Sequence, residues 1–172
     1  SITFICTLAS FGIALIIGLF AGVGRISKNT LFKNISRAYI EFIRGVPVII
    51  LLFTVAFVIV VDVAELLNLS GNQIPMILRA IIALAFFYGA YIAEVFRAGI
   101  ESVGKGQIEG GKSLGLNSKQ IMRYIILPQA FKNMLPALGN DFISMMKDSS
   151  LLSVLAVNAV SYTHLRAHET TE

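Results

Sequence analysis

Long uncharged stretches alternate along this chain with shorter stretches that carry most of the basic residues. Residues 1–24 contain no charged side chain, residues 45–61 are uncharged again, and a third, mainly apolar stretch covers 76–96. A helix rises about 1.5 Å per residue, and roughly 20 apolar residues cross the hydrocarbon core of a bilayer. The pattern therefore predicts three membrane-spanning helices, at about 2–24, 45–61 and 76–96.

A fourth and weaker membrane segment is predicted at 133–146. It is interrupted by Pro136 and by polar residues such as Asn140 and Asp141. We therefore expect a broken helix here, whose backbone groups are satisfied by neighbouring helices or by a cavity. The uncharged run 149–160 that follows is too short to cross a membrane alone.

The composition places the whole chain in a membrane. It is 56% hydrophobic and 14% charged, whereas about 25% of residues are charged in an ordinary soluble domain. This composition is not typical of a soluble globule, and we expect one all-α membrane domain, a multi-span helical bundle, over residues 1–160. The net charge is +4, but the basic residues lie between the apolar runs, so we expect a lipid bilayer and no nucleic acid as their partner.

The basic residues also predict an orientation. Residues 25–44 hold five basic side chains and one acid, and residues 97–132 form a second basic stretch. Residues 62–75 hold two acidic residues, Asp62 and Glu65, and no Lys or Arg. Because loops rich in Lys and Arg stay in the cytoplasm, we expect both basic stretches inside and the N-terminal end outside.

One motif in the second basic stretch points to a nucleotide. Residues 106–113 read GQIEGGKS and match the phosphate-binding loop. That loop needs a buried strand before it and a helix after it, so that backbone amides converge on the phosphates. Here the preceding residues end a membrane helix, and Glu109 would place a negative charge among the phosphates. We therefore expect no catalytic residue and no cofactor or metal bound by this chain.

Read further, the same segment resembles a known motif. EGGKSLGLNSKQIMRYIILP is similar to the cytoplasmic coupling motif of ABC importer permeases, in which Glu-Ala-Ala, three residues, Gly, nine residues and Ile-x-Leu-Pro follow one another. Three further stretches resemble the polar amino acid uptake branch of that family: RGVP at 44–47, AYIAEVFRAG at 90–99 and KDSSLLSV at 147–154. The residues that carry the coupling motif are Glu109, Gly110, Gly111, Gly115, Leu116, Ile125, Leu127 and Pro128.

The resemblance implies a type 1 importer (MetI-like) fold, truncated before its last helix. It implies a permease subunit, not itself an enzyme, that moves polar amino acids across a bacterial cytoplasmic (inner) membrane. A separate ATPase, which binds ATP and Mg, would dock on the loop at about 101–128. A second permease subunit would complete a homo- or heterodimer, and an extracytoplasmic substrate-binding protein would deliver the amino acid.

The residues of this loop predict its local structure. Residues 101–114 can form one short helix, after which Gly115 supplies a positive-φ stop. A second helix can begin with Asn117 as N-cap and Gln120 completing a capping box, and Pro128 follows it. One departure from the family is the Gly110–Gly111 pair in place of two alanines, because each glycine costs roughly 1 kcal/mol of helix stability.

Charged side chains within the predicted spans are candidates for the substrate pathway, because ionisable groups at membrane depth are usually functional. Glu94 and Arg97 lie three residues apart and can pair on one helix face, although both could instead extend to the headgroups. The full candidate set is Arg44, Glu94, Arg97, Asn140, Asp141, Lys147 and Asp148.

Two other transport interpretations stay open: a permease of another ABC importer branch, and a secondary transporter of small solutes. A secondary transporter is expected to show internal pseudo-symmetry, of which the sequence gives no sign. A membrane-embedded enzyme would need convergent catalytic groups, and both histidines, His164 and His168, lie in the tail. Residues 161–172 depart from the family and resemble translated adaptor sequence, so we expect them to be non-native.

Overall fold

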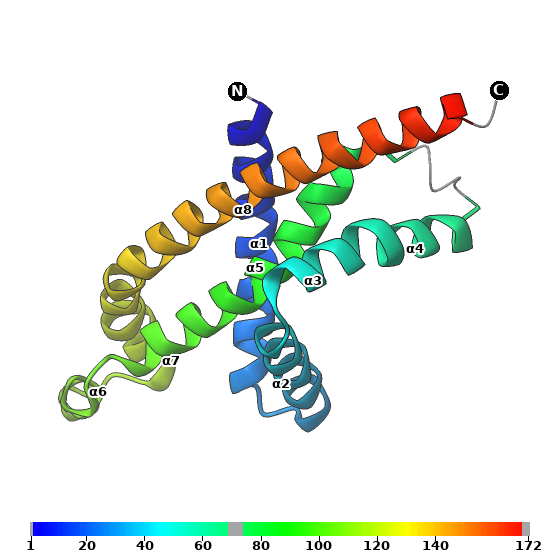
Figure 1. The fold of residues 1–172 in the computed structure, drawn as a ribbon. Helices are drawn as coiled ribbons and strands as arrows, with labels where there is room; N and C mark the ends of the chain where they lie inside the picture. Colours follow the sequence, from blue (N-terminus) through cyan, green and yellow to red (C-terminus); the bar gives the residue numbers. More distant parts are fainter. Residues whose placement is uncertain (1, 69–73, 170–172) are drawn as a thin grey trace.

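The computed structural model describes residues 2–68 and 74–169, with side chains described for 3–68 and 74–152. Within these residues the chain is built from helices joined by short connections (Figure 1). In order they are α1 (Ile2–Ile26), α2 (Thr30–Gly45), α3 (Val48–Phe53), the π-helical η1 (Thr54–Ile59), α4 (Val60–Leu66), α5 (Met76–Glu101), α6 (Lys105–Ser113), α7 (Ser118–Ile121), the π-helical η3 (Met122–Ile126) and α8 (Leu127–Glu169).

The three strongest predicted spans are confirmed as helices. In the described part of the chain, Thr3–Ile26, Val48–Leu66 and Met76–Glu101 are long and apolar enough to cross a membrane. The second span, made of α3, η1 and α4, begins three residues later than predicted because Pro47 serves as its N-cap in an extended conformation. Proline suits a helix start, since it has no N–H to leave unpaired there.

The centre of the fold is the contact between α1 and α5, which approach each other through small residues. A Cβ added to Gly18 would lie 2.6 Å from Ile92 Cγ2, and one added to Gly22 would lie 3.1 Å from the Ala93 carbonyl oxygen. Gly89 of α5 is equally close to α1. Small residues four apart on one helix face let membrane helices pack closely, which strengthens their van der Waals contact.

The first basic stretch, treated above as a loop, is largely the helix α2. Asn29 caps its first turn, and α2 then folds back against α1, where Ser36 lies against Gly24. The Tyr39 hydroxyl donates a hydrogen bond of 2.5 Å to the Phe86 carbonyl in the middle of α5. Burial raises the pKa of Tyr39, which keeps this donor protonated. The stretch is therefore a packed helix, because its apolar positions recur with helical spacing and find a partner surface.

The predicted interruption at 133–146 is wrong, since these residues lie inside the continuous helix α8 with Pro136 in its interior. The uncharged run 149–160, too short to cross a membrane alone, belongs to the same helix. Met134 and Leu138 flank the proline and are buried, and a Cβ on Gly99 of α5 would collide with Met134. A proline removes only one backbone donor, and packing on both sides of it holds the two halves of α8 together.

The suspected tail falls partly outside the described residues. Residues 170–172 are not described, and 161–169 continue the α8 backbone. Whether the tail is native stays a prediction.

Candidate functional site: a charged cavity and an exposed helical loop

Three arginines from three helices converge on one carboxylate. Glu94 of α5 pairs with Arg97 on its own helix at 2.5 Å, as its spacing predicts, and with Arg25 at the end of α1 at 2.6 Å. Arg44 of α2 lies 3.9 Å from the same carboxylate, and Arg97 also bonds Glu101. Glu94 is thus the common counter-ion of three positive charges, and it joins α1, α2 and α5 electrostatically.

Two members of this cluster, Arg44 and Glu94, line a cavity of about 370 Å³. Its charged and polar lining comes from α2, α5, the residue after α5, and α8: Arg44, Tyr91, Glu94, Ser102, Asn133 and Asp141. The Arg44 guanidinium lies 5.6 Å from the centre of the Tyr91 ring. Asp141 Oδ2 is buried and accepts no hydrogen bond within the described residues. The cavity therefore presents a cation from α2, Arg44, and an anion from α8, Asp141, beside Glu94 of α5.

The seven predicted pathway residues separate into groups. Arg44, Glu94 and Asp141 line the charged cavity, and Arg97 adjoins it through Glu94. Asp148 lines a second, smaller groove between α3 and α8. The side chains of Asn140 and Lys147 are exposed and line neither space.

Sequence reasoning missed Arg25, Tyr91, Ser102 and Asn133. Arg25 was interpreted above only as a basic residue of a cytoplasmic loop. Because it directly follows the uncharged run 1–24, its side chain could have been expected to extend along the helix toward a charged partner. Ser102 and Asn133 bond each other at 2.8 Å across α5 and α8, and nothing local in the sequence signals that contact.

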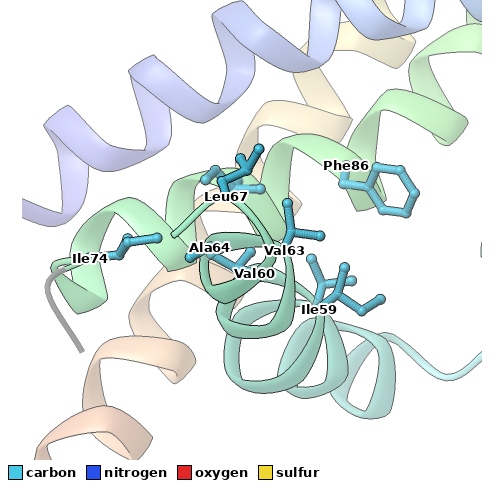
Figure 2. Close-up of a pocket in the computed structure, with 9 residues that line it drawn as sticks. Ile59, Val60, Val63, Ala64, Leu67, Ile74 and Phe86 are labelled. Carbon is cyan, nitrogen blue, oxygen red and sulfur yellow. The ribbon is translucent and has the colours of Figure 1, made fainter. Parts of the chain in front are cut away.

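A further groove of about 300 Å³ lies between α4 and α5. Figure 2 shows its lining, which includes Val60, Val63, Leu67, Ile74 and Phe86 and consists of apolar side chains alone. A polar solute would find no hydrogen-bond partner among them, so this groove is no candidate for polar substrate binding.

The second basic stretch contains the predicted helix, turn and helix. Gly115 has φ +79° and ends the first helix, as expected. Asn117 caps α7: its side chain accepts from the Gln120 amide at 3.0 Å, and its own amide donates to the Gln120 side chain at 2.9 Å. The predicted capping box is confirmed. The loop carries an exposed Glu109 and a Leu114 that is 81% exposed, which leaves an apolar and an acidic group for a partner.

Two details of this loop differ from the prediction. The expected helix at 101–114 is divided, because α5 ends at Glu101 and α6 begins at Lys105 after Gly104 takes an extended conformation. Pro128 does not follow the second helix but lies in its continuation, since α7, η3 and α8 run on without a break. The π-helical turn η3 ends at Ile126, two residues before Pro128, which has no backbone N–H to donate to the preceding turn.

The resemblance to a phosphate-binding loop is accidental. Residues 106–113 all lie within α6. In a helix the backbone amides beyond the first turn bond to carbonyls of the preceding turn, so they cannot converge on a phosphate.

Gly110 and Gly111 have different surroundings. A Cβ on Gly110 would meet no atom within 4 Å, whereas one on Gly111 would lie 2.6 Å from Ile125 Cδ1. We expect Gly110→Ala to stabilise α6 by up to about 1 kcal/mol through helix propensity, seen as a higher thermal unfolding midpoint in detergent. Gly111→Ala serves as the comparison, because displacement of Ile125 should offset the same gain. An unfolding midpoint lowered by Gly110→Ala would contradict this account.

Residues 14–169 match the family described as "Binding-protein-dependent transport system inner membrane component". The chain is 36% identical over 154 residues to the probable glutamine ABC transporter permease protein GlnM of Bacillus subtilis (strain 168), covering 90% of this chain and 68% of that protein. It is 32% identical to the histidine/lysine/arginine/ornithine transport system permease protein HisQ of Escherichia coli (strain K12), covering 99% and 77%.

Among solved structures, an amino acid ABC transporter with histidines superposes with a TM-score of 0.77 at 38% identity, over 90% of this chain and 68% of that one. The chain spans only 32% of another relative, the glutamate/glutamine/aspartate/asparagine transport system permease protein BztC of Rhodobacter capsulatus, to which it is 37% identical over 84% of its own length. With the match to the family extending over most of its residues, the chain belongs to the inner membrane components of binding-protein-dependent transport systems.

Proposed function

We propose that this chain is the membrane-spanning subunit of an ATP-driven importer of polar amino acids. Membership of the family and the amino acid permeases among its relatives support this function. A separate ATPase subunit binds ATP and Mg, a second permease subunit completes the pathway, and an extracytoplasmic binding protein delivers the amino acid. The membrane domain occupies residues 1–160 in the bacterial cytoplasmic membrane.

The observation that carries the proposal is the continuity between the exposed loop and α8. From Ser118 onward, α7, η3 and α8 form one helical path, which bears Asp141 and Asp148 farther along. Displacement of the loop by a docked ATPase would therefore move the acidic residues of α8 as part of a rigid element, the kind of motion by which transporters alternate access. Glu109 and Leu114 supply the contact, Gly115 turns the chain toward α7, and the residues from Ser118 to Pro128 supply the stiff connection.

The basic stretches set the proposed orientation. The loop that contains α6 and α7 lies in the cytoplasm and the N-terminal end lies outside. This arrangement places the loop where an ATPase has access to cytoplasmic ATP.

The charged cavity suits an amino acid. A free amino acid carries a carboxylate and an ammonium group, and the cavity offers Arg44 for the first and Asp141 for the second. Because Asp141 Oδ2 is buried and has no hydrogen-bond partner in the part of the chain that the structure describes, an ammonium donor there would satisfy a group that is otherwise costly to bury. Arg44, Glu94, Arg97, Asn140, Asp141, Lys147 and Asp148 remain the proposed pathway set, with the cavity residues at its centre.

Co-purification tests the docking site. The complete permease is purified from native membranes as wild type and as Glu109→Lys and Gly115→Asp, and the bound ATPase is measured. We expect the ATPase with wild type and its loss from both variants, because the first reverses an exposed charge and the second places a side chain at φ +79°.

Glu65→Lys is the matched control, since it makes the same charge change on an exposed residue of α4. It should retain the ATPase. Wild-type permease that brings down no ATPase would overturn the proposed function.

A further inference from the structure

A buried tyrosine contacts Asp148, an acidic residue on α8. The Tyr88 hydroxyl, on α5, donates a hydrogen bond of 2.8 Å to Asp148 Oδ2. Tyr88 is 4% exposed, and its ring is fixed by an edge contact with Phe87, with 5.3 Å between ring centres. The donor is therefore held firmly, while the acceptor lies on a different helix 60 positions along the chain.

The surroundings of Asp148 are apolar. It lines a groove of about 50 Å³ with Val48, Ile49, Leu52, Phe53, Leu151 and Leu152. Among the described residues, Tyr88 is the one hydrogen-bond donor to its carboxylate. The half-buried Asp148 keeps a second carboxylate oxygen, which can attract a cation.

The groove at Asp148, of about 50 Å³, is smaller than the charged cavity of about 370 Å³. Asp141 lies seven positions earlier on the same face of α8, about 10 Å away along the helix axis. The two carboxylates are thus spaced along one face, one in the large cavity and one in the small groove.

We propose that Tyr88 is a positioning residue: it fixes the Asp148 carboxylate so that its second oxygen receives a cationic group of the transported substrate. This inference rests on the proposed transport function. The alternative is a structural tie between α5 and α8, for which a hydrogen bond between membrane helices contributes roughly 0.6 kcal/mol.

The test compares two tyrosine-to-phenylalanine variants of the complete transporter in proteoliposomes. Uptake of radiolabelled glutamine, histidine and arginine is measured, and KM and kcat are determined for the best substrate. We expect Tyr88→Phe to raise KM about fivefold with kcat unchanged, which corresponds to about 1 kcal/mol for the lost hydrogen bond. Tyr39→Phe is the matched control, because it also removes a hydroxyl that bonds another helix, at the Phe86 carbonyl of α5, but lines neither the charged cavity nor the groove at Asp148; its KM should stay within twofold of wild type.

Asp148→Asn completes the comparison. It keeps an oxygen that can accept from Tyr88 but removes the negative charge, so KM should rise, and adding Tyr88→Phe should raise it no further. If Tyr88→Phe fails to reach the membrane, Asp148→Asn alone decides, since an unchanged KM would overturn the proposal. An active transporter in which Tyr88→Phe lowers the unfolding temperature without changing KM would show a structural tie only. Absence of uptake by the wild type would overturn the proposed function and this inference with it.

Discussion

Replacing Gly18 by leucine is expected to prevent the folded permease from accumulating in the membrane. A Cβ alone would lie 2.6 Å from Ile92 Cγ2 and 3.1 Å from the Ala93 backbone nitrogen, and leucine adds three further carbons. Relief would require α1 and α5 to separate along the contact that forms the centre of the fold. Overpacking of this kind costs about 3 kcal/mol, a large part of the free energy of unfolding of an ordinary protein.

The measurement is the amount of monodisperse permease recovered in detergent and its thermal unfolding midpoint. Gly12→Leu is the control on the same helix, because a Cβ on Gly12 would meet no atom within 4 Å. We expect near wild-type recovery from it. Equal recovery of Gly12→Leu and Gly18→Leu would show that the α1–α5 contact does not depend on Gly18.

Replacing Glu94 by glutamine is expected to destabilise the protein by about 2 kcal/mol. Glutamine keeps the size of the side chain but removes the charge that Arg25, Arg44 and Arg97 share. Removing one partner of a fully buried ion pair costs about 3–5 kcal/mol, and we reduce that figure because Glu94 is 20% exposed and solvent screens the charges in part.

The expected result is a lower unfolding midpoint, together with loss of uptake, since Arg44 and Arg97 would be free to change the shape of the charged cavity. Glu41→Gln provides the comparison. It breaks the exposed pair with Arg37, whose side chains are 61% and 55% exposed, and should change the midpoint little. A midpoint lowered equally by both variants would mean that convergence on Glu94 adds nothing beyond an ordinary surface pair.

Gly115 on one side and the pair Gly18 and Gly22 on the other show which glycine roles can be predicted from neighbouring residues alone. Gly115 was identified as a helix stop because the requirement for a positive φ is a property of one residue and its neighbours. Gly18 and Gly22 are small residues four positions apart in an apolar stretch. Their role in close helix packing depends on α5, which lies against them only in the folded protein. The capping box of Asn117 and Gln120 could likewise be predicted from local sequence, because its donors and acceptors lie within four residues.

The sequence by itself determined the apolar spans, the position of the exposed loop and the caps within it, because length, hydrophobicity and capping depend on consecutive residues. Only the tertiary structure decided that α2 folds back on α1, that α8 continues through Pro136, and that Arg25 meets Glu94 across 69 positions of chain. These outcomes depend on surfaces supplied by distant segments. Close packing around Pro136 can override its local tendency to break a helix. Arg25 and Glu94 can pair only because the folded helices α1 and α5 bring them together.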